Sequence, residues 1–173
     1  MAIERSGAVT LHGKPLTLIG PEIKVGDKAP NFKVLANDMS EVTLYTDKGK
    51  VRLLISVGSL DTPVCDTETK RFNKEAVAFP DNVTVYIISC DLPFAQKRWS
   101  DNANASNVKT LSDYRDLSFG EAYGTRVKET RLLSRAVFLV NQDDAVRYVE
   151  YVPEIVQEPN YEAVLGAVRK LEG

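Results

Sequence analysis

The middle of the chain alternates buried strands with an amphipathic helix. Residues 51–57 and 83–90 are nearly continuous apolar runs, which is typical of strands buried on both faces. Between these runs, one face of a predicted helix is formed at the expected spacing by Cys65, Thr69, Phe72, Ala76 and Phe79. Pro80-Asp81-Asn82 then ends the helix. This alternation restricts the chain to folds in which helices pack on a buried sheet.

Shorter elements on both sides extend the same pattern. Before the first run we expect two strand pairs, residues 9–11 with 16–18 and residues 32–35 with 42–45. After Cys90 we expect a helix from Asp91 through Trp99, a loop at 102–107, a strand at 108–111, a helical turn at 118–123, a hairpin of 135–140 with 145–152, and a helix at 161–171. No internal repeat is present, so we predict one α/β domain spanning residues 1–173.

Composition narrows the possible partners and the compartment. The 173 residues are 43% hydrophobic, which suits a single domain with its own core. Lys and Arg number 22 against 24 Asp and Glu, giving a net charge of −2 with the two signs interspersed, so we expect neither a nucleic-acid nor a membrane partner. Because we find neither a signal-peptide pattern nor an apolar run of membrane-spanning length, we expect a cytoplasmic protein.

The cysteine and histidine content restricts the chemistry. Two cysteines do not make a disulfide framework, so we expect both to be free thiols in a reducing compartment. His12 is the only histidine, which argues against Cys–His or Ser–His catalysis and against a histidine-rich metal site. We therefore predict neither a metal nor another cofactor.

Thr62-Pro63-Val64-Cys65 is a favourable place for a thiolate. Thr62 is a predicted N-cap and Pro63 suits the first helical position, so Cys65 lies in the first turn, where free N–H groups and the helix dipole favour negative charge. Such settings lower cysteine pKa values from about 8.5 to roughly 3.5–7.5. The Thr62 hydroxyl could lie beside the sulfur and donate to it or to a peroxide. Arg135, at the start of an apolar strand, needs an anionic partner and is the candidate cation for this site.

These residues resemble the peroxiredoxins, and the flanking sequence resembles their bacterial thiol peroxidase subfamily, the atypical two-cysteine peroxiredoxins. The most specific matching motifs are Ser59-Leu60-Asp61-Thr62-Pro63-Val64-Cys65, Asp91-Leu92-Pro93-Phe94-Ala95-Gln96-Lys97-Arg98-Trp99, Leu111-Ser112-Asp113, Ser118-Phe119-Gly120 and Leu132-Leu133-Ser134-Arg135-Ala136-Val137-Phe138. The resemblance implies a thioredoxin-like fold with a central mixed sheet flanked by helices and an N-terminal β-hairpin, in a homodimer.

The same resemblance implies a function and the residues that perform it. The activity is that of an antioxidant thiol peroxidase, which reduces hydrogen peroxide and organic hydroperoxides and is itself reduced by thioredoxin or another external thiol. Cys65 corresponds to the peroxidatic cysteine, which is oxidised to a sulfenic acid, and Thr62 and Arg135 correspond to the activating residues. Oxidation to sulfenic acid is also the first step expected of an accessible low-pKa thiol.

Two positions depart from the family pattern. Gly58 replaces the proline that begins the active-site motif, so we expect a more flexible loop and a less shielded sulfur. Ser100 occupies the position of the resolving cysteine and cannot form a disulfide. It is either a natural loss or a substitution that traps the enzyme, and the absence of the expected glycines from residues 101–106 favours natural loss. Cys90 is then either a small core residue or a substitute resolving cysteine, and its position at a stiff strand end favours the core.

Alternative interpretations remain at this stage. Cys65 could be only a buried helix residue, and Arg135 only a surface residue at a strand start. The competing function is a peroxide sensor or redox-regulated binding protein that has little turnover. A thiol–disulfide oxidoreductase is disfavoured because the chain has no Cys-x-x-Cys pair.

Overall fold

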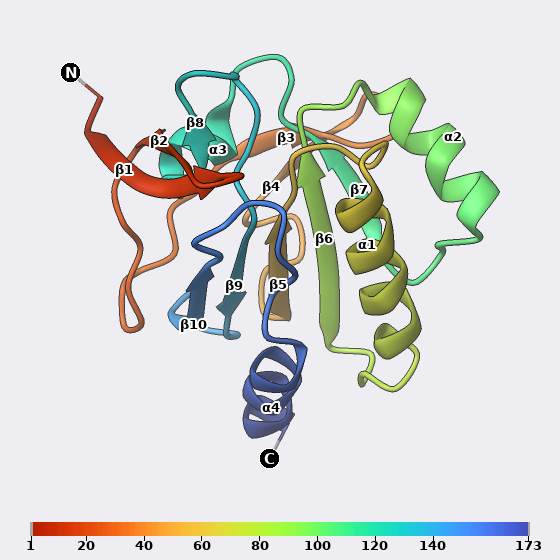
Figure 1. Ribbon diagram of the computed structural model, residues 1–173. Coiled ribbons are helices and arrows are strands. Elements are labelled where there is room, and N and C mark those ends of the chain that lie inside the picture. The colour runs from red at the N-terminus through yellow and green to blue at the C-terminus, as the bar shows by residue number, and fades with distance from the viewer. Residues whose placement is uncertain (1, 173) are drawn as a thin grey trace.

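A seven-stranded mixed sheet forms the centre of the computed structural model, which describes residues 2–172 (Figure 1). The strand order is β10-β9-β5-β6-β7-β3-β4. Strands β5, β6 and β7 run parallel, while β9 pairs antiparallel with β5 and β3 pairs antiparallel with β7. The bounds of these strands are β3 Lys33–Leu35, β4 Glu41–Thr43, β5 Val51–Ser56, β6 Val83–Ser89, β7 Lys109–Ser112, β9 Ala136–Val140 and β10 Val146–Tyr151.

Each face of this sheet has its own hydrophobic cluster. Alternate residues of a strand point to opposite faces. Leu53 and Ile55 of β5 therefore belong to what we call the first cluster, and Leu54 belongs to the second cluster. Helices α1 (Pro63–Ala76) and α4 (Tyr161–Glu172) contribute to the first cluster, and α2 (Pro93–Ala103) lies on its edge. Helix α3 (Ser118–Ala122) covers the second cluster. The predicted α/β architecture and mixed central sheet are therefore confirmed.

A second, three-stranded sheet lies beside the main one at the upper left of Figure 1. Strands β1 (Glu4–Leu11) and β2 (Lys14–Ile19) form the predicted N-terminal hairpin, with the turn at His12-Gly13. Strand β2 also pairs with β8 (Arg126–Val127), which sequence analysis did not predict. Two residues provide too short a pattern for a strand to be predicted from periodicity.

Two predicted helix ends differ from the structure. Helix α1 ends at Ala76, before the predicted Phe79, because the next residues form tighter turns in which the Phe79 amide donates to the Ala76 carbonyl. Pro80 disfavours helical geometry at the residue before it. Helix α2 extends to Ala103, so the predicted loop at 102–107 begins two residues late, at Asn104, whose left-handed conformation (φ 51°) caps the helix.

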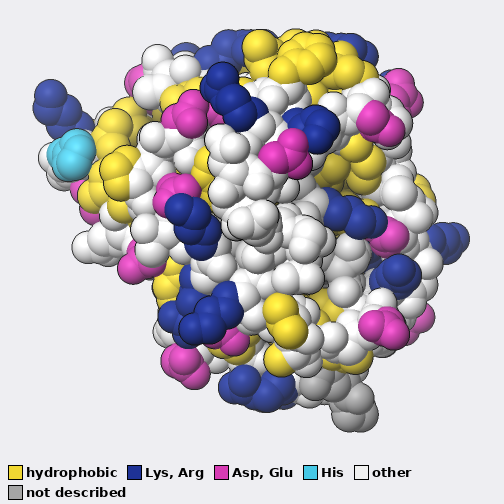
Figure 2. Space-filling model, turned by 90° about the vertical axis from the view of Figure 1, so that its right-hand side faces the viewer, with side chains coloured by type: hydrophobic (Ala, Val, Ile, Leu, Met, Phe, Trp, Pro, Cys, Tyr) yellow, Lys and Arg dark blue, Asp and Glu magenta, His cyan; other side chains and the backbone are white. Residues whose placement is uncertain are grey.

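The surface contains charges of both signs without a block of one sign on the face that Figure 2 shows. Within residues 2–172, no helix is long and apolar enough to cross a membrane.

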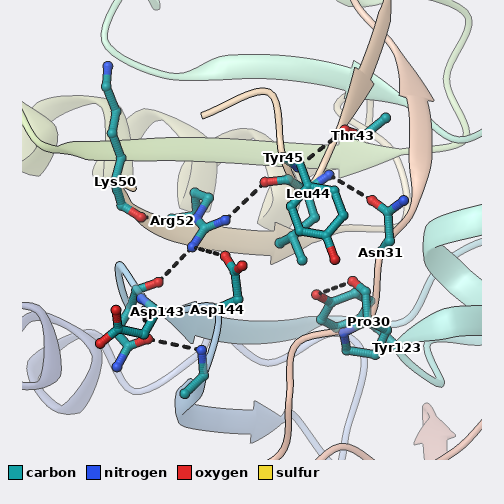
Figure 3. Close-up of polar contacts among 12 residues, drawn as sticks. Pro30, Asn31, Thr43, Leu44, Tyr45, Lys50, Arg52, Tyr123, Asp143 and Asp144 are labelled. Carbon is teal, nitrogen blue, oxygen red and sulfur yellow. Dashed lines mark hydrogen bonds and ion pairs between the residues drawn. The ribbon is translucent and has the colours of Figure 1, made fainter. Parts of the chain in front are cut away.

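A buried arginine, Arg52, joins several chain segments near the start of β5 (Figure 3). The Arg52 side chain is fully buried, and its guanidinium donates to the carbonyls of Lys50, Leu44 and Asn141 at 3.0, 3.0 and 2.6 Å. Its Nη2 also pairs with the Asp144 carboxylate at 2.8 Å. One charged side chain thus satisfies the backbone of three separate segments, as a buried charge requires.

We predict that Arg52→Leu lowers the free energy of unfolding by about 3–5 kcal/mol, because Asp144 and three carbonyls lose their partner. Chemical denaturation measures this loss. Arg147→Leu, at an exposed position of β10, is the control and should change stability by less than about 0.5 kcal/mol. Equal losses in the two variants would contradict the anchoring role of Arg52.

Candidate active site

The chain turns from strand to helix at the carboxyl end of β5, as predicted. Thr62 has extended geometry (φ −93°, ψ 146°) at the N-cap of α1, and Pro63 follows at the start of the helix. Pro63 has no N–H, and the Asp66 amide donates to the Thr62 carbonyl. The amides of Val64 and Cys65 are therefore the first-turn donors that have no acceptor within the helix. The Cys65 side chain is only 2% exposed and packs with the first cluster.

Thr62 occupies the predicted N-cap position, but its side chain bonds to the preceding loop. Its hydroxyl makes no capping hydrogen bond and instead donates to the Ser59 carbonyl at 2.7 Å. Among the described residues, no hydrogen bond joins Thr62 to Cys65. A bond to the carbonyl three residues earlier stabilises the loop, and this local alternative competes with capping for threonine side chains.

Strand pairing brings Arg135 to the same place from a distant part of the chain. Strand β9 runs antiparallel to β5 with Ala136 opposite Ser56, so Arg135 lies just beyond the end of β5. The Ser56 hydroxyl donates to the Ser134 carbonyl at 2.7 Å and fixes this register. Because Arg135 is two residues before Val137, it is directed to the face of the sheet that α1 covers.

The Arg135 guanidinium contacts three partners while only 2% exposed, so the alternative of a surface arginine is excluded. Its Nη2 donates to the Cys65 Sγ at 3.3 Å, and its Nε donates to the Ile155 carbonyl at 2.9 Å. Its Nη1 pairs with the Glu68 carboxylate. Burial alone would lower the pKa of Arg135, but the adjacent Glu68 and Cys65 raise it above its ordinary value, so the guanidinium remains charged.

Glu68 is the member of this site that sequence analysis missed. It lies one turn after Cys65 on α1, is fully buried, and has one carboxylate oxygen, Oε1, without a hydrogen-bond partner. Burial raises its pKa to about 7, although Arg135 acts in the opposite direction. The signal was present in the sequence, because residues three apart share a helix face and Glu68 therefore faces the same way as Cys65.

A cavity of about 350 Å³ opens onto Cys65 and Arg135. The N-terminal hairpin, the loop before α1 and the segments around residues 127–135 and 155–156 enclose it. Most of its wall is apolar, from Leu11, Leu16, Val64, Val127, Leu132, Leu133, Ile155 and Val156, and Gly58, Thr62 and the exposed His12 also line it. A cavity of this size and character suits a small, largely apolar ligand.

The Asp91 carboxylate holds the loop before Cys65 in place. It accepts hydrogen bonds from the Ser59 hydroxyl at 2.7 Å, the Leu60 amide at 2.8 Å and the Ser89 hydroxyl at 2.8 Å. A second link joins α2 to α1, since the Trp99 indole donates to the Asp66 carboxylate at 2.8 Å. The loop that follows Gly58 is therefore restrained by side chains from a neighbouring strand end and helix.

The two cysteines belong to opposite faces of the main sheet. Both are free thiols, but Cys65 packs with the first cluster and Cys90 with the second. Burial, reinforced by Asp113, raises the pKa of the Cys90 thiol to about 12. Ser100 lies in the last turn of α2, where its hydroxyl donates to the Ala105 carbonyl at 3.2 Å. The geometry thus brings together Cys65, Arg135 and Glu68 but neither Cys90 nor Ser100.

This arrangement can stabilise negative charge on the Cys65 sulfur. The buried Arg135 guanidinium donates a hydrogen bond to the sulfur. The free amides of the first helical turn also favour negative charge there. The Cys65 and Arg135 side chains are each only 2% exposed, and this burial strengthens the interactions between them. The site therefore combines a buried thiol, a guanidinium within hydrogen-bond distance of the sulfur and a small apolar cavity.

The chain is similar in both sequence and structure to known proteins. The Redoxin family model matches residues 24–165. A peroxiredoxin-like protein from Aquifex aeolicus has a similar structure, with a TM-score of 0.89, 43% identity and 98% of each chain covered. The fold is thus that of a peroxiredoxin.

Relatives identified by sequence define a narrower family within this fold. A thiol peroxidase of Halalkalibacterium halodurans is 57% identical over 94% of this chain and 97% of the relative, and one of Bacillus subtilis is 50% identical over the same shares. The chain therefore belongs to the thiol peroxidase family of peroxiredoxin enzymes, which confirms the resemblance inferred from the sequence motifs.

We predict that Asp91→Asn slows oxidation of Cys65 and lowers the free energy of unfolding by about 1–3 kcal/mol. In this variant an amide NH2 group, which is a donor, replaces a carboxylate oxygen that accepts hydrogen bonds, so two donors would face each other. Denaturation and stopped-flow oxidation measure the two effects. Asp101→Asn, an exposed change on α2, is the matched control. Wild-type oxidation kinetics in Asp91→Asn would show that this carboxylate does not position the loop.

We predict that Gly58→Ala stabilises the protein by about 0.4–1 kcal/mol, since alanine restricts the unfolded chain more than glycine does. The backbone at Gly58 is not left-handed, and a Cβ there would meet only the Leu133 carbonyl, at an ordinary 3.6 Å. The shift in the denaturation midpoint tests this prediction. A lower midpoint would show that the loop requires glycine.

Proposed function

We propose that Cys65 is the peroxidatic cysteine of this thiol peroxidase and that Arg135 activates it, with Thr62 as the third residue of the site. The observation that supports this assignment most directly is the 3.3 Å contact between the Arg135 Nη2 and the Cys65 Sγ at the base of the apolar cavity. Buried guanidinium groups require an anionic partner, and a thiolate meets that requirement.

The reaction we propose begins with attack of the Cys65 thiolate on the terminal oxygen of a hydroperoxide. A sulfur–oxygen bond forms as the O–O bond breaks, so sulfur is oxidised to sulfenic acid and the leaving oxygen departs as alkoxide or hydroxide. A proton converts that leaving group to an alcohol or to water. Thr62 contributes by holding the loop through its bond to Ser59, and its hydroxyl can turn toward a bound peroxide from the cavity wall.

The proposed substrates are hydrogen peroxide and organic hydroperoxides. The wall of the cavity is mostly apolar, and burying an alkyl group there is favourable by about 0.8 kcal/mol per methylene. We therefore propose that organic hydroperoxides are accepted at least as well as hydrogen peroxide.

We propose that an external thiol, thioredoxin or another reductant, recycles the sulfenic acid. Ser100 has no thiol, and Cys90 packs on the other face of the sheet with a raised pKa, which makes it a poor attacking group. Two free cysteines and a thiol reductant fit a reducing, cytoplasmic compartment. A homodimer is also proposed, on the family resemblance alone.

Peroxide consumption in the presence of a thiol reductant tests this assignment. We expect sustained turnover in wild type, none in Cys65→Ser, and wild-type rates in Cys90→Ser, because Cys90 lies outside the site. Stoichiometric oxidation without turnover would favour a peroxide sensor. Loss of turnover in Cys90→Ser with retained folding would make Cys90 the resolving residue and overturn the proposed recycling.

Intact mass after one equivalent of peroxide, without reductant, tests the recycling step separately. We expect a gain of one oxygen in wild type, because the sulfenic acid has no intramolecular thiol partner. A loss of two hydrogens would instead indicate a disulfide between Cys65 and Cys90. Ser100→Cys is the informative comparison, since a loss of two hydrogens there would show that the family position can still reach Cys65.

A further inference from the structure

Cys65 and Glu68 are two acidic groups that both contact one buried cation, Arg135. Arg135 donates from Nη2 to the sulfur at 3.3 Å and pairs through Nη1 with the Glu68 carboxylate. The exposed fractions are 2% for Cys65, 0% for Glu68 and 2% for Arg135. Within residues 2–172, the only ion pair of Glu68 is the one with Arg135. The two acidic groups therefore compete for a single positive charge.

Charge balance limits the protonation states of this cluster. If both acids were ionised, the cluster would have a net charge of −1 inside an apolar core, and if both were protonated it would have a net charge of +1. Burying an uncompensated charge is costly, so the neutral state with one proton on the two acids is favoured. The Glu68 Oε1 has no partner, which penalises a carboxylate more than a neutral carboxyl.

The neighbouring charges also favour the protonated form of Glu68. Glu150 from β10 and Glu158 from the segment before α4 disfavour a second negative charge at Glu68. Tyr161 of α4 also lies within electrostatic range of Glu68. Arg71, the next cation along α1, is engaged elsewhere, since it pairs with Glu75 and its guanidinium lies 4.6 Å from the centre of the Tyr161 ring. None of these groups replaces Arg135.

We propose that Cys65 and Glu68 share one proton beneath Arg135, so that the reactive thiolate forms by transfer of the cysteine proton to the Glu68 carboxylate. In this step the S–H bond breaks, an O–H bond forms on Glu68, and the Arg135 charge is unchanged. The proposal rests on the assignment of Cys65 as the reacting thiol. Glu68 is then the group that holds the cysteine proton, and it does not line the cavity.

The same proton balances the peroxide reaction. When the thiolate becomes a neutral sulfenic acid, its negative charge leaves with the alkoxide. Glu68 then gives up its proton and again pairs with Arg135 as a carboxylate, while the alkoxide in the cavity takes up one proton from solvent to become an alcohol, so the proton count balances without direct transfer from Glu68 to the leaving oxygen. Burial raises the pKa of Glu68 to about 7, so the carboxyl can hold and release a proton near neutral pH.

Thiolate absorbance as a function of pH tests the proposal without any turnover, in a Cys90→Ser background that leaves Cys65 as the only thiol. We expect Glu68→Gln to keep the thiolate to a pH lower by about one unit or more, because a neutral amide no longer competes for Arg135. Glu75→Gln, an equivalent change at the half-exposed position on the same helix, should titrate as the parent does. If Glu68 only orients Arg135, the thiolate should instead need a higher pH.

Infrared spectroscopy of the protonated carboxyl provides a second readout. We expect a buried carboxylic acid band in the reduced parent that is absent in Glu68→Gln and is lost in Cys65→Ser, where Arg135 has only Glu68 to pair with. A band that Cys65→Ser leaves unchanged, or an unchanged or raised thiolate titration in Glu68→Gln, would overturn the shared proton. Peroxidase failure with both signatures intact would refute the proposed function alone.

Discussion

The buried guanidinium of Arg135 is the interaction on which the site depends. One planar group contacts the Cys65 sulfur, the Glu68 carboxylate and the Ile155 carbonyl, and so connects helix α1, strand β9 and the segment before α4. Such a charge is tolerated inside a core only while its partners are present. The contacts that allow Arg135 to be buried therefore also place a positive charge beside the Cys65 sulfur.

The main sheet lies between the two cysteines of the chain. Cys65 lies on the face covered by α1 and α4, and Cys90 on the face covered by α3. A disulfide requires Cα atoms within about 7 Å, which a sheet between two thiols opposes. Ser100, in the last turn of α2, has no thiol, so the geometry fits the proposal that another molecule carries out the recycling step.

The sequence predicted the fold well wherever periodicity was strong. The strands of the main sheet, the hairpin β1–β2 and helices α1, α2 and α4 all appear near their expected positions. The errors occurred where local rules decide the outcome, as at the end of α1 before Pro80, at the left-handed Asn104 and in the two-residue strand β8. Thr62 shows the same limit, because its hydroxyl had two local acceptors and only the folded loop selects Ser59.

By itself, the sequence determined that Cys65 opens a helix after a buried strand, and it named Arg135 as its partner from the cost of burying a guanidinium. Only the tertiary structure decided the geometry of that pair, because the antiparallel register of β5 and β9 joins residues 70 positions apart. The structure also decided that Glu68 shares the cation and that Cys90 does not reach the site. Each of these outcomes depends on which face of the sheet a side chain occupies and on what packs against that face, and neither is a local property of the chain.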